Sequence, residues 1–256
     1  LMLPLSQKKI KDLTFMHLNI SSLTYHIDEL SELLNNLEQK FKIIAITESK
    51  LSNKTAQKNT IKLPGYNYEQ TSTASNKGGT LLYIDEELNY KNRNELNIIK
   101  EKELESSFIE ILAENQTNTI VGCIYKHPWL SISEFSEDYL QPLLNKLEKE
   151  NKNIVLLGDF NINLLQYEEN KHIRQFLDSM YTSDLSPKLT IPTRVTPRSK
   201  TLIDNNFTNH LSKDLICGNI TYDISDHLVQ FLMFERHDTN IENKTENKSK
   251  RNYKKL

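Results

Sequence analysis

Polar residues stand at the ends of several apolar runs, where a folded β-sheet would bring them together. In five places along the chain, an apolar run stops at, or is followed by, a carboxylate, a carboxamide or a histidine. Because strand ends meet at one edge of a sheet, where α/β enzymes commonly place their sites, these groups can converge. Such a cluster could bind a hard cation through its oxygens and transfer a proton through its histidine. Its members are Asn19, Glu48, Asp159 with Asn161, Asp204, and Asp226 with His227.

Two short motifs in this set are more specific than the rest. In the segment 158–161 (GDFN), glycine permits a tight turn, and two polar groups two residues apart can point the same way. The segment 225–227 (SDH) joins an acid to the one residue type that titrates near neutrality. Each also has an ordinary structural explanation, since acidic residues after strands commonly form turns or cap helices. Neither motif decides the function by itself.

The elements that must position these residues alternate between strands and helices. Residues 23–37, 132–147 and about 169–181 are predicted to form three helices, the first two from apolar residues at helical spacing. Short apolar runs bounded by turn residues predict the strands. The predicted strands cover residues 13–19, 42–47, 66–70, 79–84, 108–113, 118–125, 153–157, 202–208, 215–222 and 228–234.

The pattern predicts one α/β domain over residues 10–235. Direct β–β steps occur beside β–α steps, which disfavours a plain doubly wound parallel sheet. A four-layer α/β sandwich fits better, with two mixed β-sheets packed face to face and helices outside. Residues 236–256 are Asn, Lys, Glu and Thr with almost no apolar side chain, so we expect a polar, disordered linker there.

Composition excludes several classes of protein. No apolar run approaches the roughly 18 residues of a membrane helix, and the N-terminal segment is unlike a secretory signal. With Cys123 and Cys217 as the two cysteines and no Cys/His cluster, a zinc site or disulfide framework is not expected. The net charge of -2 means that any phosphate-binding surface must be a local patch. We expect an intracellular protein, and a fragment of a longer reading frame, since no initiator Met is present.

Beyond these single motifs, short segments follow one another in a fixed order along nearly the whole predicted domain. They combine the polar strand ends with glycine turns and proline-bounded stretches. They are HLNI at 17–20, ITESKL at 46–51, GY at 65–66, KGG at 77–79, YKHP at 125–128, GDFN at 158–161, PTR at 192–194, TLID at 201–204 and SDH at 225–227.

In this order and approximate spacing, the segments resemble the exonuclease–endonuclease–phosphatase superfamily, which includes apurinic/apyrimidinic endonucleases. Within it, the chain most resembles the endonuclease domain of LINE-type (non-LTR) retrotransposons, over about residues 10–235. The resemblance implies an enzyme that nicks one DNA strand and leaves a 3′-hydroxyl from which a covalently linked reverse transcriptase primes. It also implies Mg²⁺ as the cofactor, or Mn²⁺ in its place, and action in the nucleus.

The resemblance also assigns roles to individual residues. Glu48 would bind the metal ion, and Asn19 would complete the surroundings of that ion. Asp159 or His227 would act as the general base, a choice that the sequence leaves open. The other catalytic residues would be Tyr125 and Asn161 as phosphate ligands, Asp204 as the partner of His227, and Asp226 near the metal.

Basic residues gather beside these motifs and could hold the phosphates of a DNA strand. Three of them lie in a proline-bounded stretch before Asp204, and two stand within other motif segments. A solvated face of a lysine-rich protein is the ordinary alternative for such residues. The predicted DNA-binding residues are Arg194, Arg198, Lys200, Lys77 and Lys126.

Two other functions stay open on the sequence alone. A phosphatase of the same superfamily would act on inositol phosphates or another small phosphoester. An inactive or host-recruited copy would bind DNA through its basic loops without cutting it. Asn206 favours such a diverged copy, because related sequences generally carry an aliphatic residue there, and an unpaired buried amide costs on the order of 1–3 kcal/mol. Lys126 stands where an arginine is common and loses the bidentate phosphate fork.

Overall fold

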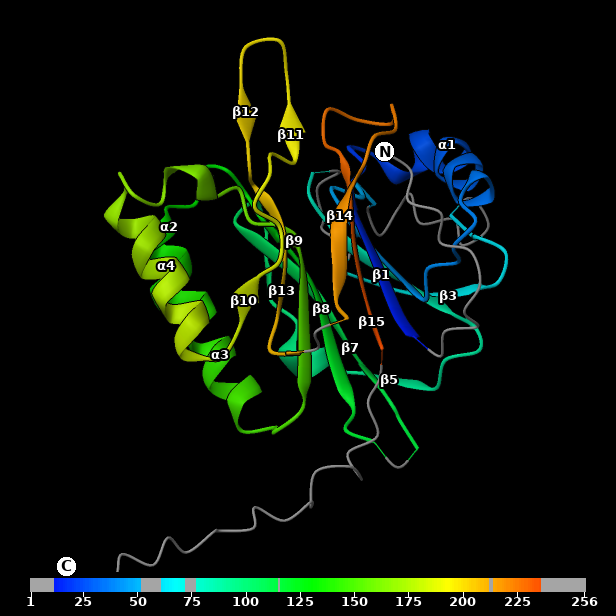
Figure 1. The fold of residues 1–256 in the computed structure, drawn as a ribbon, viewed down its shortest axis with the longest axis horizontal. Helices are drawn as coiled ribbons and strands as arrows, with labels where there is room; N and C mark the ends of the chain where they lie inside the picture. The colour runs from blue at the N-terminus through cyan, green and yellow to red at the C-terminus, as the bar shows by residue number, and fades with distance from the viewer. Residues whose placement is uncertain (1–11, 52–60, 72–76, 115, 212–213, 236–256) are drawn as a thin grey trace, which may run out of the picture.

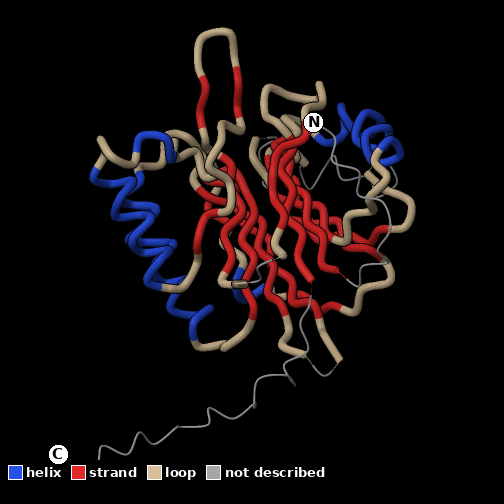
Figure 2. Tube along the Cα trace, viewed as in Figure 1, coloured by secondary structure: helices blue, strands red, loops and turns tan. Residues whose placement is uncertain are grey.

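Two mixed β-sheets packed face to face form the centre of the computed structural model, which describes residues 12–51, 61–71, 77–114, 116–211 and 214–235. Helices cover the outer face of each sheet, as Figure 1 and Figure 2 show. The predicted four-layer α/β sandwich is therefore confirmed. The predicted linker at 236–256 lies outside the described residues.

The first sheet has the strand order β14-β15-β1-β2-β4-β3. Strands β1 and β2 are parallel, and the other neighbours are antiparallel. Helix α1 (Leu23–Asn36) covers its outer face and packs Leu30 and Leu33 against the sheet. The strands are β1 (Asp12–Asn19), β2 (Ile43–Thr47), β3 (Tyr66–Thr71), β4 (Thr80–Asp85), β14 (Ile216–Ile220) and β15 (Val229–Glu235).

The second sheet has the strand order β10-β13-β9-β8-β7-β5, and the short β6 also pairs with β7. Strands β8 and β9 are parallel, and the other neighbours are antiparallel. Helices α2 (Ile132–Glu134), α3 (Gln141–Glu148) and α4 (Lys171–Thr182) cover its outer face (Figure 1). The strands are β5 (Tyr90–Asn92), β6 (Ile99–Lys100), β7 (Leu104–Ile111), β8 (Thr119–Lys126), β9 (Asn153–Asp159), β10 (Ser186–Pro187) and β13 (Asp204–Thr208).

The central strands β2, β8 and β9 are mainly apolar because both of their faces are buried. In β2, Ile43 and Ala45 point into the core between the sheets, whereas Ile44 and Ile46 point toward α1. This double burial explains why the sequence shows continuous apolar runs in place of strict alternation. It also explains why each run ends abruptly where the chain leaves the sheet.

The second predicted helix is continuous in space but not uniform. A π-helical segment, Phe135–Leu140, lies between α2 and α3. Pro142 in the first turn of α3 has no N–H to donate to the carbonyl of Asp138, and this loss interrupts the regular i→i−4 ladder. Within the described residues, no helix is long and apolar enough to cross a membrane.

A separate hairpin formed by β11 (Arg194–Val195) and β12 (Lys200–Thr201) was not predicted by the apolar pattern. It stands clear of both sheets at the upper edge of the molecule in Figure 1. Its residues are mostly exposed, including Val195 at 44%. A strand that buries neither face has no reason to alternate apolar and polar residues, so periodicity carries no signal for it. The strand predicted at 202–208 begins only at Asp204 for another reason: Leu202 and Ile203 are buried, but their backbone N–H groups donate to the side chains of Asn163 and Thr193 and not to a neighbouring strand.

Asn206 is a buried amide whose replacement is expected to stabilise the protein. Its side chain is fully buried on β13 opposite Leu157, a residue of the core between the sheets. Neither its Oδ1 nor its Nδ2 has a hydrogen-bond partner in the described part of the chain. We expect Asn206→Val to raise the free energy of unfolding by about 1–3 kcal/mol, measured by urea denaturation.

The neighbouring Asn205 supplies the matched control. Its Oδ1 accepts from the backbone N–H groups of Lys188 and Leu189, at 3.1 and 3.2 Å, and its Nδ2 donates to the carbonyl of Leu189 at 3.0 Å. Asn205→Val is therefore expected to destabilise the protein, because it leaves the buried N–H and carbonyl of Leu189 without these hydrogen bonds. Equal effects of the two substitutions would contradict the assignment of Asn206 as an unsatisfied amide.

Candidate functional site

The first sheet delivers two of the predicted residues to one edge. Asn19 is the last residue of β1 and is in register with Thr47, the last residue of the parallel strand β2. Glu48 follows directly with a positive φ of 50°, a conformation that non-glycine residues seldom adopt. The turn is fixed by the backbone N–H of Lys50, which donates to the carbonyl of Gly78 at 2.8 Å. Strained backbone of this kind is often found at functional sites.

The second sheet delivers three more residues to the same place. Asp159 is the last residue of β9 and is in register with Tyr125 on the parallel strand β8. Asp204 is the first residue of β13 and pairs with Asp159 across the antiparallel ladder. The carboxyl end of β9 and the start of β13 therefore coincide, which places two carboxylates side by side.

Asn19 joins the two sheets at the site. Its buried Nδ2 donates to Oε1 of Glu48 at 3.0 Å and to Oδ2 of Asp159 at 2.9 Å. The phenol of Tyr125 donates to the same Oε1 of Glu48 at 3.1 Å. Burial, together with the negative charges of Glu48 and Asp159, raises the pKa of Tyr125 far above its usual value, so the phenol stays protonated. The structure thus brings four of the predicted residues into contact.

Asp159 is held on both of its oxygens. Besides the bond from Asn19, its Oδ1 accepts from the backbone N–H of Asn161 at 2.9 Å. Asn161 has a positive φ of 47°, and its Nδ2 donates to the carbonyl of Lys126 at 2.8 Å. Burial and the nearby charge of Asp204 raise the pKa of Asp159 well above its usual range. The carboxyl is therefore poised to exchange a proton near neutral pH.

His227 and Asp204 form a buried pair. Nδ1 of His227 lies 2.9 and 3.1 Å from the two carboxylate oxygens of Asp204. The hydroxyl of Thr193 accepts a hydrogen bond from the backbone N–H of Asp204 at 3.1 Å, which helps to hold Asp204 in position. Burial alone would lower the pKa of His227, but the charge of Asp204 outweighs burial and raises it to about 9. The same attraction lowers the pKa of Asp204 against the effect of its burial.

Ligand atoms of Asp159, Asp204 and His227 all lie within 4.8 Å of one another. This cluster has the composition of a metal site, but Nδ1 of His227 is already bound to Asp204. A cation between these two groups would have to displace that hydrogen-bonded ion pair. Glu48 is more accessible, with 24% of its side chain exposed and Lys50 Nζ as a cation 3.4 Å from its Oε2. The geometry therefore favours the Glu48 side of the site for a divalent cation.

Asp226 lies at the rim of the site. Its side chain is 48% exposed, and its Oδ1 is 3.9 Å from Nε2 of His227. Its Oδ2 accepts from Arg194, at 2.7 Å from Nε and 2.6 Å from Nη2. Arg194 also forms an isolated β-bridge with His227. Arg194, predicted as a DNA-binding residue, is thus engaged with Asp226 beside the histidine.

The other predicted DNA-binding residues divide into two groups. Arg198 and Lys200 are exposed on the β11–β12 hairpin, and Lys77 is exposed beside Gly78. Lys126 departs from the expectation, because its side chain is buried and its Nζ donates to the carbonyl of His127 at 3.1 Å. Burial lowers the pKa of Lys126 to about 8. This lysine supports the site from within and does not offer its charge to a surface ligand.

His17 is a supporting residue that was not among the predicted site residues. It is fully buried, donates from Nδ1 to Gln230 Oε1 at 2.5 Å, and accepts at Nε2 from the Thr47 hydroxyl at 3.1 Å. Its Nδ1 lies 4.0 Å from Asp204. Burial lowers the pKa of His17 to about 4, so the ring is neutral. Its position two residues before Asn19 on β1 was the available signal, since such residues share one face of a strand.

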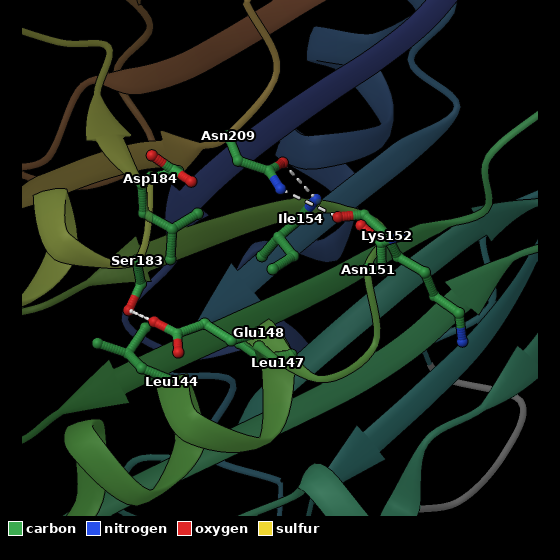
Figure 3. Close-up of a pocket in the computed structure, with 10 residues that line it drawn as sticks. Leu144, Leu147, Glu148, Asn151, Lys152, Ile154, Ser183, Asp184 and Asn209 are labelled. Atoms are coloured by element: carbon green, nitrogen blue, oxygen red, sulfur yellow. Dashed lines mark hydrogen bonds between the residues drawn. The ribbon is translucent and has the colours of Figure 1, made fainter. Parts of the chain in front are cut away.

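A pocket of about 140 Å³ lies away from this site. Figure 3 shows it between the end of α3, the turn after α4 and the start of β9, where Glu148 accepts a hydrogen bond from Ser183. None of the predicted site residues lines it. The site itself lies where strand ends of the two sheets meet, as the contact between Asn19 and Asp159 shows.

Comparisons with known proteins agree on the fold. No family model and no curated protein matches the sequence. Among solved structures, AP endonuclease LMAP from Leishmania major has a TM-score of 0.68 at 13% identity, covering 88% of this chain and 88% of that chain. The endonuclease domain of TRAS1, a telomere-specific non-LTR retrotransposon, has a TM-score of 0.67 at 15% identity, covering 88% and 99%. The 3′-5′ exonuclease NExo from Neisseria meningitidis has a TM-score of 0.65 at 15% identity, covering 87% and 100%.

These similarities show that the chain shares its four-layer α/β fold with two endonucleases and an exonuclease. The fold places a buried acidic cluster with a histidine at one edge of the sandwich. An AP endonuclease, an exonuclease and a retrotransposon endonuclease share this fold, so the fold does not choose among their substrates.

Proposed function

We propose that this chain is a Mg²⁺-dependent endonuclease that nicks one strand of DNA and leaves a 3′-hydroxyl for target-primed reverse transcription. The observation that carries the proposal is the single network in which Asn19 connects Glu48 with Asp159, beside the His227–Asp204 pair. This network contains a site for a hard cation, a carboxyl with a raised pKa and a positively charged imidazole. Those are the groups that phosphodiester hydrolysis requires.

The residues present fit a Mg²⁺ ion. Mg²⁺ prefers oxygen ligands and keeps several waters, so a partly exposed carboxylate suits it better than a buried histidine. Glu48 would hold the ion, with Asn19 completing its surroundings and Asp226 at the rim. When bound, the ion would supply polarisation of the phosphoryl oxygens and stabilisation of the leaving oxygen.

His227 and Asp159 have different roles in proton transfer. His227 is protonated at neutral pH, because Asp204 occupies its Nδ1 and raises its pKa, so it donates a hydrogen bond and cannot act as the base. Asp159 then orients the attacking water and accepts its proton. Asn161 retains one amide hydrogen for a phosphoryl oxygen, since the other is donated to the carbonyl of Lys126.

DNA is favoured over a small phosphoester by the basic hairpin beside the site. The β11–β12 hairpin projects beyond the two sheets (Figure 1). Arg198 and Lys200 lie exposed on that hairpin, and Arg194 at its base contacts Asp226. Phosphates of a strand that crosses the site would meet these charges. The covalently linked reverse transcriptase and the nuclear site of action are parts of the proposal that rest on the sequence motifs.

Nicking of supercoiled plasmid tests the proposal directly. We expect the purified protein to convert supercoils into open circles with Mg²⁺ or Mn²⁺, and EDTA to abolish the conversion. Glu48→Gln should raise the Mg²⁺ concentration needed for half-maximal nicking by about tenfold or more, because a neutral amide is a poorer ligand for a hard cation.

The same purified protein distinguishes two alternative functions, a phosphatase and an inactive DNA-binding copy. Intact plasmid together with phosphate release from inositol phosphates would favour the phosphatase. Intact plasmid that is nevertheless retarded on a gel would favour an inactive DNA-binding copy. Glu87→Gln, which makes the same chemical change at an exposed position outside the site, should leave nicking unchanged.

A further inference from the structure

A ladder of three aromatic rings leads from the site to the surface. The rings of Tyr125 and His127 are 4.6 Å apart, and those of His127 and Trp129 are 4.7 Å apart. Tyr125, at the inner end, donates to the Glu48 carboxylate at 3.1 Å. Trp129, at the outer end, is 62% exposed. The Trp129 indole is therefore connected, through the rings of His127 and Tyr125, to the proposed metal ligand Glu48.

The middle ring of this ladder is locked in place. Nε2 of His127 lies 2.9 and 3.1 Å from the oxygens of Glu105, and both side chains are buried. Gly78 packs against this pair so closely that a Cβ would lie 2.6 Å from Glu105 Oε2 and 2.8 Å from His127 Nε2. The carbonyl of Gly78 in turn accepts the backbone N–H of Lys50 in the Glu48 turn. Gly78 thus links the aromatic ladder to the turn that carries Glu48.

The outer ring is oriented as well. Its Nε1–H donates to the carbonyl of Lys102 in the turn between β6 and β7. The polar edge of the indole is thereby satisfied, and His127 packs against the ring. What Trp129 still offers is an exposed aromatic surface with no unmet hydrogen bond. Such a surface binds a flat, apolar group by stacking.

We propose that Trp129 is the stacking platform for a nucleobase of the DNA strand next to the cleaved phosphodiester. The proposal rests on the nuclease function proposed above. In DNA, the flat groups attached closest to a phosphodiester are the bases of the adjoining nucleotides. A base can reach Trp129 only after it leaves its stack in the duplex, which costs least where the base is mispaired. Trp129 therefore gives the enzyme a preference for DNA in which that base is unpaired.

Two duplexes and three protein variants test this role. Binding is measured by anisotropy of a fluorescein-labelled duplex, either fully paired or with a central mismatch, in an Asp159→Asn background that keeps the strands intact. The parent should bind the mismatched duplex more tightly. Trp129→Ala should weaken that binding about fivefold or more, as loss of a base–aromatic stack does, and should remove the preference. Trp129→Phe should retain most of both, because it keeps a ring.

Emission from Trp129 gives a second readout, since it is the sole tryptophan of the chain. Stacking of a base should quench this emission in parallel with the rise in anisotropy. Saturated binding with unchanged emission, or an intact mismatch preference in Trp129→Ala, would overturn the inference while leaving the nuclease function standing. Failure of every variant to bind either duplex would overturn both together. Thermal denaturation of Trp129→Ala checks that the variant is folded.

Discussion

Asp159→Asn will lower the rate of plasmid nicking by at least a hundredfold and leave the fold intact. The substitution keeps the shape of the side chain but removes the carboxylate that accepts a proton from the attacking water. Proton transfer by a positioned side chain contributes about 10²–10⁴-fold to a rate, so its loss should be of that order. An amide Oδ1 can still accept from the backbone N–H of Asn161, which holds the residue in place in the structure.

Burial of Asp159 makes this variant informative about stability too. Its carboxyl carries a raised pKa because burial and Asp204 penalise the charge, so a neutral amide relieves that penalty. This relief should offset the loss of the hydrogen bond from Asn19, so Asp159→Asn should denature close to the temperature of the parent. Asp184→Asn is the matched control, since it makes the same change at an exposed residue beside the remote pocket. A near-normal nicking rate for Asp159→Asn would contradict the assignment of Asp159 as the general base.

The ends of the buried strands could be predicted from the sequence. Residues 43–46 are apolar because both faces of the strand are covered, and the change to polar residues marks where the strand reaches the edge of the sheet. Asn19, Glu48 and Asp159 stand at such ends, and all three meet in the structure. Local sequence therefore contains the information on which residues reach the edge of a sheet.

Contacts between distant strands could not be predicted in the same way. Asn19 and Asp159 are 140 residues apart, and His17 and Gln230 are 213 residues apart. Their meeting depends on sheet order and register, which local periodicity does not encode. The motif order supplied this information only through its resemblance to proteins of known fold.

The surroundings of the basic residues also escaped prediction. Lys126 and Arg194 both lie beside motif residues, yet one is buried and the other pairs with Asp226. A lysine next to a strand end can point inward or outward, and the choice depends on which partner the fold presents. For Lys126 that partner is a carbonyl oxygen inside the protein.

Asp204→Asn will lower the free energy of unfolding of the metal-free protein by about 3 kcal/mol near pH 6, and this loss will shrink as the pH rises from about 6.5 through 9. His227 has a pKa of about 9 in the folded protein, against roughly 6.5 in an unfolded chain. Each unit of pKa corresponds to about 1.36 kcal/mol. With 7% of the His227 side chain exposed, solvent screens the pair little.

The sign of the pH dependence follows from the direction of the shift. A histidine whose pKa is raised on folding contributes its full stabilisation below about pH 6.5, where both states are protonated. That contribution is lost as the pH rises toward 9 and His227 gives up its proton in the folded state. Asp159 also raises the pKa of His227 and persists in the variant, so 3 kcal/mol is an upper value.

Urea denaturation of both proteins in EDTA at pH 6, 8 and 10 measures this dependence. The curves of parent and Asp204→Asn should converge with rising pH, whereas a constant difference would show that the aspartate acts through packing alone. His227→Gln is the control, since without a titrating ring the alkaline slope should disappear even with Asp204 in place. The pH dependence of nicking should change as well, because only a protonated His227 donates to the phosphate. The nicking rate of Asp204→Asn should therefore begin to fall at a lower pH than the nicking rate of the parent.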